Sequence, residues 1–191
     1  MPSYIFVSPG SDPGAGLALV DPMLSSSRPS MGTCRPDLRR MVKPGDHIFV
    51  VSGSRGRIYP QYVIGGMQID EKLEDQLEAL RRLPQNRLIF DGRNKSGNII
   101  ALPNGTQHPL DGHSNFESRI KNYVLGKNAV VLETPKEVEI GRERSVEILS
   151  RLFDRPGLRI QEVMGRNRKL SDAQADRLRR ALEDIKHEAR A

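Results

Sequence analysis

The alternation of apolar and polar positions predicts short β-strands in the first two thirds of the chain. Aromatic and aliphatic residues fill the run from Tyr4 to Val7, which ends at a Ser-Pro-Gly turn. Two further β-rich runs, His47–Val51 and Tyr62–Ile69, enclose a loop of glycine, serine and arginine, a pattern that favours a hairpin. The same reasoning predicts strands at Leu88–Phe90, Ile99–Leu102 and Ala129–Leu132.

A helical period appears at four places. Leucines at 73, 77 and 80 predict a helix over Glu71–Arg82, which Pro84 closes, and Pro36 suits the first turn of a short helix. Beyond residue 135 the apolar spacing predicts a helix over Arg142–Phe153. A last helix is indicated by a capping box, Ser171 with Gln174, and by an apolar stripe at Ala175, Leu178, Leu182 and Ile185.

These elements predict an α+β fold built on a small, mostly antiparallel β-barrel with peripheral helices, because five or six short strands with few helices among them fit a barrel. We expect the barrel over residues 1–135 and a helical C-terminal extension over residues 136–191. The stripe on the last helix must pack on something. The sequence leaves open whether that is the barrel, the preceding helix or a second copy, so a homodimer through the C-terminal helices is one expected arrangement.

The charge distribution favours a polyanionic partner only weakly. The 191 residues include 30 Lys and Arg against 24 Asp and Glu, a formal net charge of +6. The excess is carried by residues 1–70, with 7 basic and 5 acidic residues, and by residues 141–191, with 13 and 9. A basic surface attracts nucleic acid by releasing counterions, yet many basic proteins never bind it.

The cysteine content and the hydropathy of the chain indicate the cellular compartment to expect. The single cysteine, Cys34, cannot form an internal disulfide, and no charged-then-apolar leader opens the chain. No apolar run reaches the roughly 18 residues that a membrane helix needs. We therefore expect a cytoplasmic protein without a membrane partner.

The first candidate site is a basic rim around the predicted hairpin. Guanidinium groups bind phosphate oxygens bidentately, so arginines beside an exposed loop suit a phosphate backbone. A solvated helix and loop face is the alternative. The loop lacks the Gly-Lys-Ser/Thr ending of a phosphate-binding loop, which argues against a nucleoside triphosphate site. The rim consists of Arg35, Arg39, Arg40, Lys43, Arg55 and Arg57.

The second candidate is a polar cluster between residues 108 and 123. His108, Asp111 and His113 could hold a metal or move a proton, but no second ligand pair with familiar spacing accompanies them, so we expect no metal and no other cofactor. Amide and aromatic groups read and stack bases, so Asn115, Phe116 and Arg119 favour a grip on a ligand instead. A plain polar loop is the alternative.

Cys34 is a candidate nucleophile. Neighbouring positive charge from Arg35 would favour its thiolate, although a lone cysteine is more often a small buried apolar residue. An enzyme acting on a nucleotide or modified base could use Cys34, His47 or His113 as nucleophile, acid or base. The chain contains no established catalytic motif, so the enzyme stays an alternative.

Several motifs together resemble a known family. They are Cys34-Arg35-Pro36, Arg39-Arg40, Lys43-Pro44-Gly45-Asp46-His47-Ile48, Val51-Ser52-Gly53-Ser54 and Val63-Ile64-Gly65-Gly66-Met67. This set resembles the nucleotide-modification-associated domains, relatives of the EVE and ASCH modules in the PUA-like barrel superfamily, over residues 3–133. The resemblance implies a PUA-like barrel that binds nucleic acid or a nucleotide, often with a modified base in its cleft.

The leading hypothesis is therefore a nucleic-acid or nucleotide-binding module whose partner is DNA, RNA or a free nucleotide. The arginines would position phosphates, while serine, amide and aromatic groups would contact a base. An enzyme and an adaptor that uses its C-terminal helix remain as alternatives. The expected binding residues are Arg35, Arg39, Arg40, Lys43, Ser52, Ser54, Arg55, Arg57, Tyr59, His113, Asn115, Phe116 and Arg119.

Overall fold

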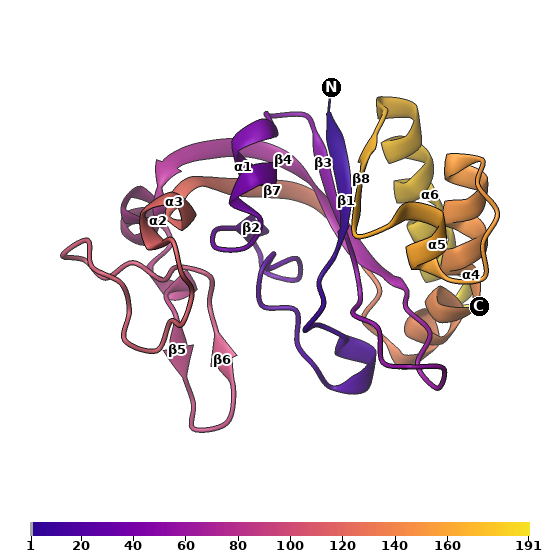
Figure 1. The fold of residues 1–191 in the computed structure, drawn as a ribbon, viewed down its shortest axis with the longest axis horizontal. Coiled ribbons are helices and arrows are strands. Elements are labelled where there is room, and N and C mark those ends of the chain that lie inside the picture. Colours follow the sequence, from indigo (N-terminus) through magenta and orange to yellow (C-terminus); the bar gives the residue numbers. More distant parts are fainter. Residues whose placement is uncertain (1) are drawn as a thin grey trace. The chain divides into compact units, whose positions relative to one another are not determined.

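The computed structural model describes residues 2–191 and shows an α+β chain with a six-stranded mixed sheet (Figure 1). The strand order is β2-β7-β4-β3-β1-β8, and a separate two-stranded ribbon joins β5 to β6. The strands are β1 Ser3–Val7, β2 Ser30–Met31, β3 His47–Val51, β4 Val63–Asp75, β5 Ile89–Phe90, β6 Lys95–Ser96, β7 Lys121–Val131 and β8 Asn167–Leu170.

The predicted β-barrel is wrong. The sheet is open, since β2 and β8 end the strand order and do not pair with each other. Two strand pairings that the sequence analysis did not predict explain why the sheet is open. β1 pairs with β3 in parallel, from Tyr4 with Ile48 to Val7 with Val51, instead of closing an antiparallel meander. A strand from the C-terminal segment, β8, then covers the other edge of β1.

The chain divides into two compact units that are not contiguous in sequence. Unit 1 comprises residues 2–19, 46–68 and 128–191, and unit 2 comprises residues 20–45 and 69–127. Strands β4 and β7 each begin in one unit and end in the other. Each unit has its own helices and its own buried side chains.

Unit 1 places three α-helices beside the β3-β1-β8 part of the sheet: α4 Pro135–Phe153, α5 Ile160–Met164 and α6 Asp172–Glu188 (Figure 1). A short 3-10 turn, Pro13–Ala15, follows β1. The predicted capping box of the last helix is confirmed, because the Ser171 hydroxyl accepts the Gln174 N–H and the Gln174 side chain accepts the Ser171 N–H. The predicted apolar stripe is buried at Ala175, Leu178, Leu182 and Ile185.

Unit 2 contains α1 Pro36–Met41, α2 Gln76–Arg82, the 3-10 turn Pro84–Asn86 and α3 Phe116–Arg119. The helix predicted over Glu71–Arg82 starts later than expected, because β4 continues to Asp75. The Asp75 carboxylate then caps α2 by accepting the N–H groups of Leu77 and Glu78. Ile99–Leu102, predicted as a strand, makes only isolated bridges. Its apolar side chains instead join small buried clusters with Leu88 and Tyr123.

Over residues 2–191, the helices are all too short or too polar to cross a membrane.

Candidate nucleic-acid interface

The thirteen predicted binding residues are divided between the two units. Unit 1 holds Ser52, Ser54, Arg55, Arg57 and Tyr59, and unit 2 holds Arg35, Arg39, Arg40, Lys43, His113, Asn115, Phe116 and Arg119. We therefore consider the two groups separately. Within each unit, burial and hydrogen bonding separate side chains that support the fold from those that are available to a ligand.

Arg39 supports the fold and is not part of a phosphate-binding rim. Its side chain is fully buried, and its guanidinium donates to five backbone carbonyls. The donor–acceptor distances are 2.9 Å to Cys34 O, 2.6 Å to Arg119 O, 3.1 Å to Asn122 O and 3.3 Å to Thr33 O, and Lys121 O is the fifth acceptor. Burial lowers the pKa of Arg39, while the nearby Asp21 raises it. All of its hydrogen-bonding capacity is directed inward, so it cannot reach a phosphate.

Asp21 organises the same buried region, although the sequence analysis did not single it out. Its carboxylate accepts the backbone N–H groups of Gly32 and Thr33, both at 2.9 Å, and that of Cys34. The Asn98 side-chain amide donates to it at 2.9 Å. Polar groups in this interior are satisfied by one another, which fixes the loop that precedes α1.

Cys34 is not an activated nucleophile. Burial, followed by the negative charge of Asp21, raises the pKa of its thiol from 9.0 to about 12, despite the opposing charges of Arg119 and Arg39. The thiol therefore stays protonated at neutral pH, and the alternative of an enzyme using Cys34 gains no support.

Alkylation of Cys34 tests this protonation state. Thiolate is the reactive form, and a pKa raised by about three units leaves roughly a thousandfold less of it at neutral pH. In the native protein, iodoacetamide should react roughly a thousandfold more slowly than in urea at neutral pH, and the rate should keep rising about tenfold per pH unit beyond 9.0, the ordinary pKa of a thiol. In urea the same thiol should react fast, and its rate should level off above that pH. Equal rates in the two states would contradict the assignment.

Four other predicted residues of unit 2 are already engaged. Arg35 forms a bidentate pair with Asp37, at 2.9 and 2.6 Å, which neutralises its charge. Phe116 packs against the cluster around Leu88 and Ile100. The other two are Arg119, which donates to Ser114 O and Thr33 O, and His113, whose Nδ1 lies 2.5 Å from Asp111 Oδ1.

The other three predicted residues of unit 2 are exposed. Arg40 lies in the last turn of α1, Lys43 lies just beyond that helix, and Asn115 precedes α3. Among residues 2–191, no His, Cys, Asp and Glu side chains gather in a group of three that could hold a metal ion. Within residues 108–113, the Leu110 N–H donates to His108 Nδ1 at 3.1 Å, and the Asp111 carboxylate lies against His113.

In unit 1 the predicted residues lie on one loop between β3 and β4. Ser52 is buried and its hydroxyl accepts the Tyr62 N–H at 3.0 Å, so it anchors the base of the loop. Residues 54–60 are exposed throughout, and the side chain of Ile58 is 85% exposed. Arg55 donates to Gly10 O at 3.2 Å.

This loop forms one wall of a hollow of about 570 Å³, and the segment at the start of α5 forms the other. Leu158, 90% exposed, gives that second wall an apolar side chain. Arg159 is paired with Glu162 at 2.7 Å, whereas Arg57 makes no ion pair within the described chain. Hydrogen bonds from Leu158 N–H and Arg159 hold the pKa of Glu162 below its usual range. The lining residues are Ser54, Gly56, Arg57, Pro60, Leu158, Arg159 and Glu162.

Tyr59 is held by a neighbouring arginine. The Arg142 guanidinium carbon lies 5.5 Å from the centroid of the Tyr59 ring and 4.8 Å from that of Tyr62. Arg142 is itself fixed by an ion pair with Asp12 at 2.6 Å. The Tyr59 ring is 46% exposed, so part of it remains available beside the loop.

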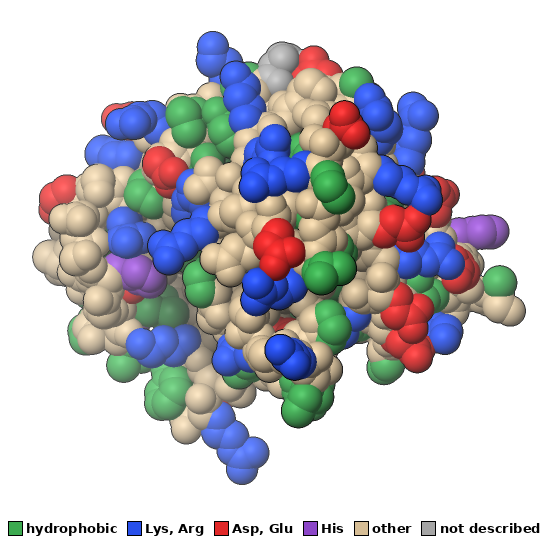
Figure 2. All heavy atoms as spheres, turned by 45° about the vertical axis from the view of Figure 1, so that its right-hand side comes forward, with side chains coloured by type: hydrophobic (Ala, Val, Ile, Leu, Met, Phe, Trp, Pro, Cys, Tyr) green, Lys and Arg blue, Asp and Glu red, His purple; other side chains and the backbone are tan. Residues whose placement is uncertain are grey.

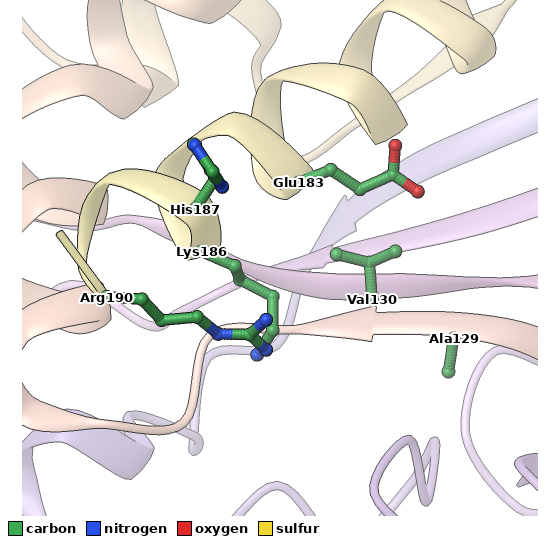
Figure 3. Close-up of a pocket in the computed structure, with 6 residues that line it drawn as sticks. All are labelled: Ala129, Val130, Glu183, Lys186, His187 and Arg190. Carbon is green, nitrogen blue, oxygen red and sulfur yellow. The ribbon is translucent and has the colours of Figure 1, made fainter.

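A second, smaller hollow of about 270 Å³ lies in unit 1 between the end of α6 and β7 (Figure 3). Lys186 donates to Val131 O at 2.5 Å and pairs with Glu137 at 3.1 Å, so its charge is used within the fold. His187 and Arg190 are exposed at its edge. In the view of Figure 2, Lys and Arg side chains are interspersed with Asp and Glu instead of forming one continuous patch.

No protein-family model matches the chain, and no curated protein and no solved structure is significantly similar to it.

Proposed function

We propose that the protein binds nucleic acid or a nucleotide at the hollow between the 54–60 loop and the start of α5. The observation that carries the proposal is the exposed guanidinium of Arg57, which lines this hollow without an acidic partner in the described chain, next to the apolar side chain of Leu158. A free cation beside an apolar surface provides for both parts of a nucleotide. The cation attracts the phosphate and the apolar surface covers the sugar or base.

The size of the hollow and the positive charge of the loop support this proposal. A hollow of about 570 Å³ falls within the range of small-molecule sites, roughly 300–1,000 Å³. Arg55 lies on the same loop and makes one long hydrogen bond, at 3.2 Å, to a backbone carbonyl, which leaves most of its donors open. Tyr59 lies on the same loop and is 46% exposed, and aromatic rings are the groups on which bases stack.

The resemblance of the 34–67 motifs to nucleotide-modification-associated domains supports the same proposal, because Ser52-Gly53-Ser54 of that resemblance leads directly into the loop. The proposal needs neither a barrel nor a cysteine nucleophile. The proposed binding residues are Ser54 and Arg57 in the hollow, Arg55 and Tyr59 on the same loop, and Leu158 and Arg159 on the opposite wall.

Binding of labelled single-stranded DNA and RNA and of labelled nucleotides at two salt concentrations tests the proposal. The variant Arg57→Gln should weaken polynucleotide binding and reduce the salt slope by about 1, since one phosphate contact is lost. The matched control is Arg177→Gln, which removes the same charge from an exposed position on α6 and should bind normally.

Two outcomes would refute this site. One is the absence of salt-sensitive binding by the unmodified protein. The other is equal binding by the Arg57 and Arg177 variants, which would show that only the net charge matters.

A further inference from the structure

The β5–β6 ribbon of unit 2 exposes apolar side chains on both of its faces. Ile89 and Phe90 are consecutive residues of one strand and so point to opposite faces. Their side chains are 48% and 49% exposed. Figure 1 shows the ribbon extending away from α2 and α3 of the same unit. Neither face is used to build a core.

The ribbon is also basic. Arg87, Arg93 and Lys95 are exposed, against one acidic residue, Asp91. The Asp91 carboxylate accepts the N–H groups of Arg93 and Asn94, both at 2.8 Å, and these bonds hold its pKa below the usual range. The Asp91 carboxylate therefore stabilises the turn at the tip of the ribbon and, within the described chain, forms no ion pair with the ribbon's arginines. Arg87 and Arg93 have no ion-pair partner in residues 2–191.

The pairing register places an aromatic ring and a cation on one face. Phe90 is opposite Lys95, and Ile89 is opposite Ser96, and residues directly opposite in an antiparallel pair share a face. Lys95 is steadied by a hydrogen bond from its ammonium to Leu110 O at 2.5 Å. One face thus offers a ring beside a positive charge.

The root of the ribbon is fixed, although its end is exposed. Leu88 N–H donates to Ile99 O at 2.8 Å, and Asn98 N–H donates to Asn86 O at 2.9 Å. The side chains of Asn86 and Asn98 are buried and donate to Tyr123 Oη and Asp21 at 3.0 and 2.9 Å. The ribbon therefore projects from the buried polar network in a set direction, as a recognition element must.

We propose that this ribbon enters the major groove of double-stranded DNA, with Arg87 and Arg93 on backbone phosphates and Phe90 against the bases. The positive charge selects a polyanion, and exposed apolar groups beside it select one with base edges and methyl groups to cover. The major groove of B-form DNA admits a two-stranded ribbon, whereas that of A-form RNA is too narrow and deep. The ribbon is thus specific to DNA duplexes and is separate from the hollow of unit 1.

Fluorescence anisotropy with a short labelled DNA duplex, its single strand and an RNA duplex of the same sequence tests this proposal. Phe90→Ala should weaken binding to the DNA duplex by up to about tenfold, because its apolar contact with base edges and thymine methyl groups is lost. Arg93→Gln should weaken it as well and lower the salt slope by about 1. Binding to the single strand, which the unit 1 hollow would provide, should not change in either variant.

Two control variants of the same kind, one on unit 2 and one on unit 1, test whether the effect is specific to the ribbon. Met41→Ala removes an apolar side chain that is 40% exposed on α1, and Arg177→Gln removes one charge from α6. Both should bind the DNA duplex like the unmodified protein. Unchanged thermal melting of all four variants would show that the fold is intact, as their exposed positions lead us to expect.

Three results would overturn the proposal. The first is duplex binding by Phe90→Ala and Arg93→Gln that equals that of the unmodified protein, or no duplex binding by the unmodified protein at all. The second is RNA duplex binding as tight as DNA duplex binding and equally sensitive to Phe90. The third is a change in mass by sedimentation in Phe90→Ala without a change in DNA binding, which would make the ribbon an interface between copies of this chain.

Discussion

Replacing Arg39 with alanine is expected to lower the free energy of unfolding by about 3–5 kcal/mol, one of the two largest effects that the structure predicts. The guanidinium binds five backbone carbonyls, from the segment before α1, from α3 and from the start of β7. Alanine would leave those carbonyls buried without donors and would open a cavity where the side chain lay. Urea denaturation followed by circular dichroism measures the loss.

Arg40 supplies the matched control, because it is the next residue of the same helix and has the same chemistry. Its side chain is exposed, so Arg40→Ala should change the free energy of unfolding by no more than about 0.5 kcal/mol. Similar effects of the two substitutions would contradict the buried, hydrogen-bonded position of Arg39. A lysine at 39 should also destabilise, since an ammonium cannot reach acceptors arranged for a planar fork.

The substitution Gly97→Ala should destabilise the protein by about 3 kcal/mol or more, because steric conflict adds to backbone strain. Gly97 has φ +88°, and a Cβ there would lie 2.6 Å from the carbonyl carbon of Arg87 and 2.8 Å from Asn86 O. These are backbone atoms and cannot rotate away. The change therefore separates the two strands at the root of the ribbon, and hydrogen exchange at the Leu88 amide, bonded to Ile99 O, should accelerate.

Gly92 provides a control that separates backbone strain from steric conflict. It has φ +96°, and a Cβ there would meet no atom within 4 Å. Gly92→Ala should therefore cost only the conformational penalty, about 1–2 kcal/mol, and should leave the Leu88 amide protected. If both alanines cost the same, the close approach of the backbone at Gly97 would not be the cause.

The parts of the fold that depend on local sequence could be predicted. β1 and β3 alternate apolar residues between turn signals, α1 begins at a proline, and α6 carries both its capping box and its stripe. Each of these signals is contained in about a dozen residues, so no knowledge of distant partners was needed.

The features that failed depend on pairing between distant segments. β8 reads Asn-Arg-Lys-Leu, which has no apolar alternation because an edge strand can be polar, and only its pairing with β1 makes it a strand. Leu73, near the end of β4, has the spacing to Leu77 and Leu80 that a helix would give. The pattern therefore predicted a helix that begins about one turn before α2 does. Without β8 and without the parallel pairing of β1 with β3, the sheet appeared to close.

At the candidate site, sequence could supply residue types but not burial. Arg39 and Arg40 are adjacent and chemically equal, yet one is fully buried and the other exposed. Which arginine points inward depends on the carbonyls that α1 packs against, and three of the five come from residues some eighty positions away. Leu158 and Arg159 were missed for the same reason, since nothing in their own segment indicates the loop they face.

The flanking of β1 by β3 and β8 has a consequence for synthesis on the ribosome. β1 is synthesised before β3 and long before β8, the strand of residues 167–170 that covers its second edge. Until then, the N–H and C=O groups along one side of Tyr4, Ile5 and Phe6 are open to any passing strand. Until β8 is synthesised, β1 therefore has an unpaired edge that can pair with strands of other chains. We expect chaperones that bind extended apolar segments to protect β1 during this time.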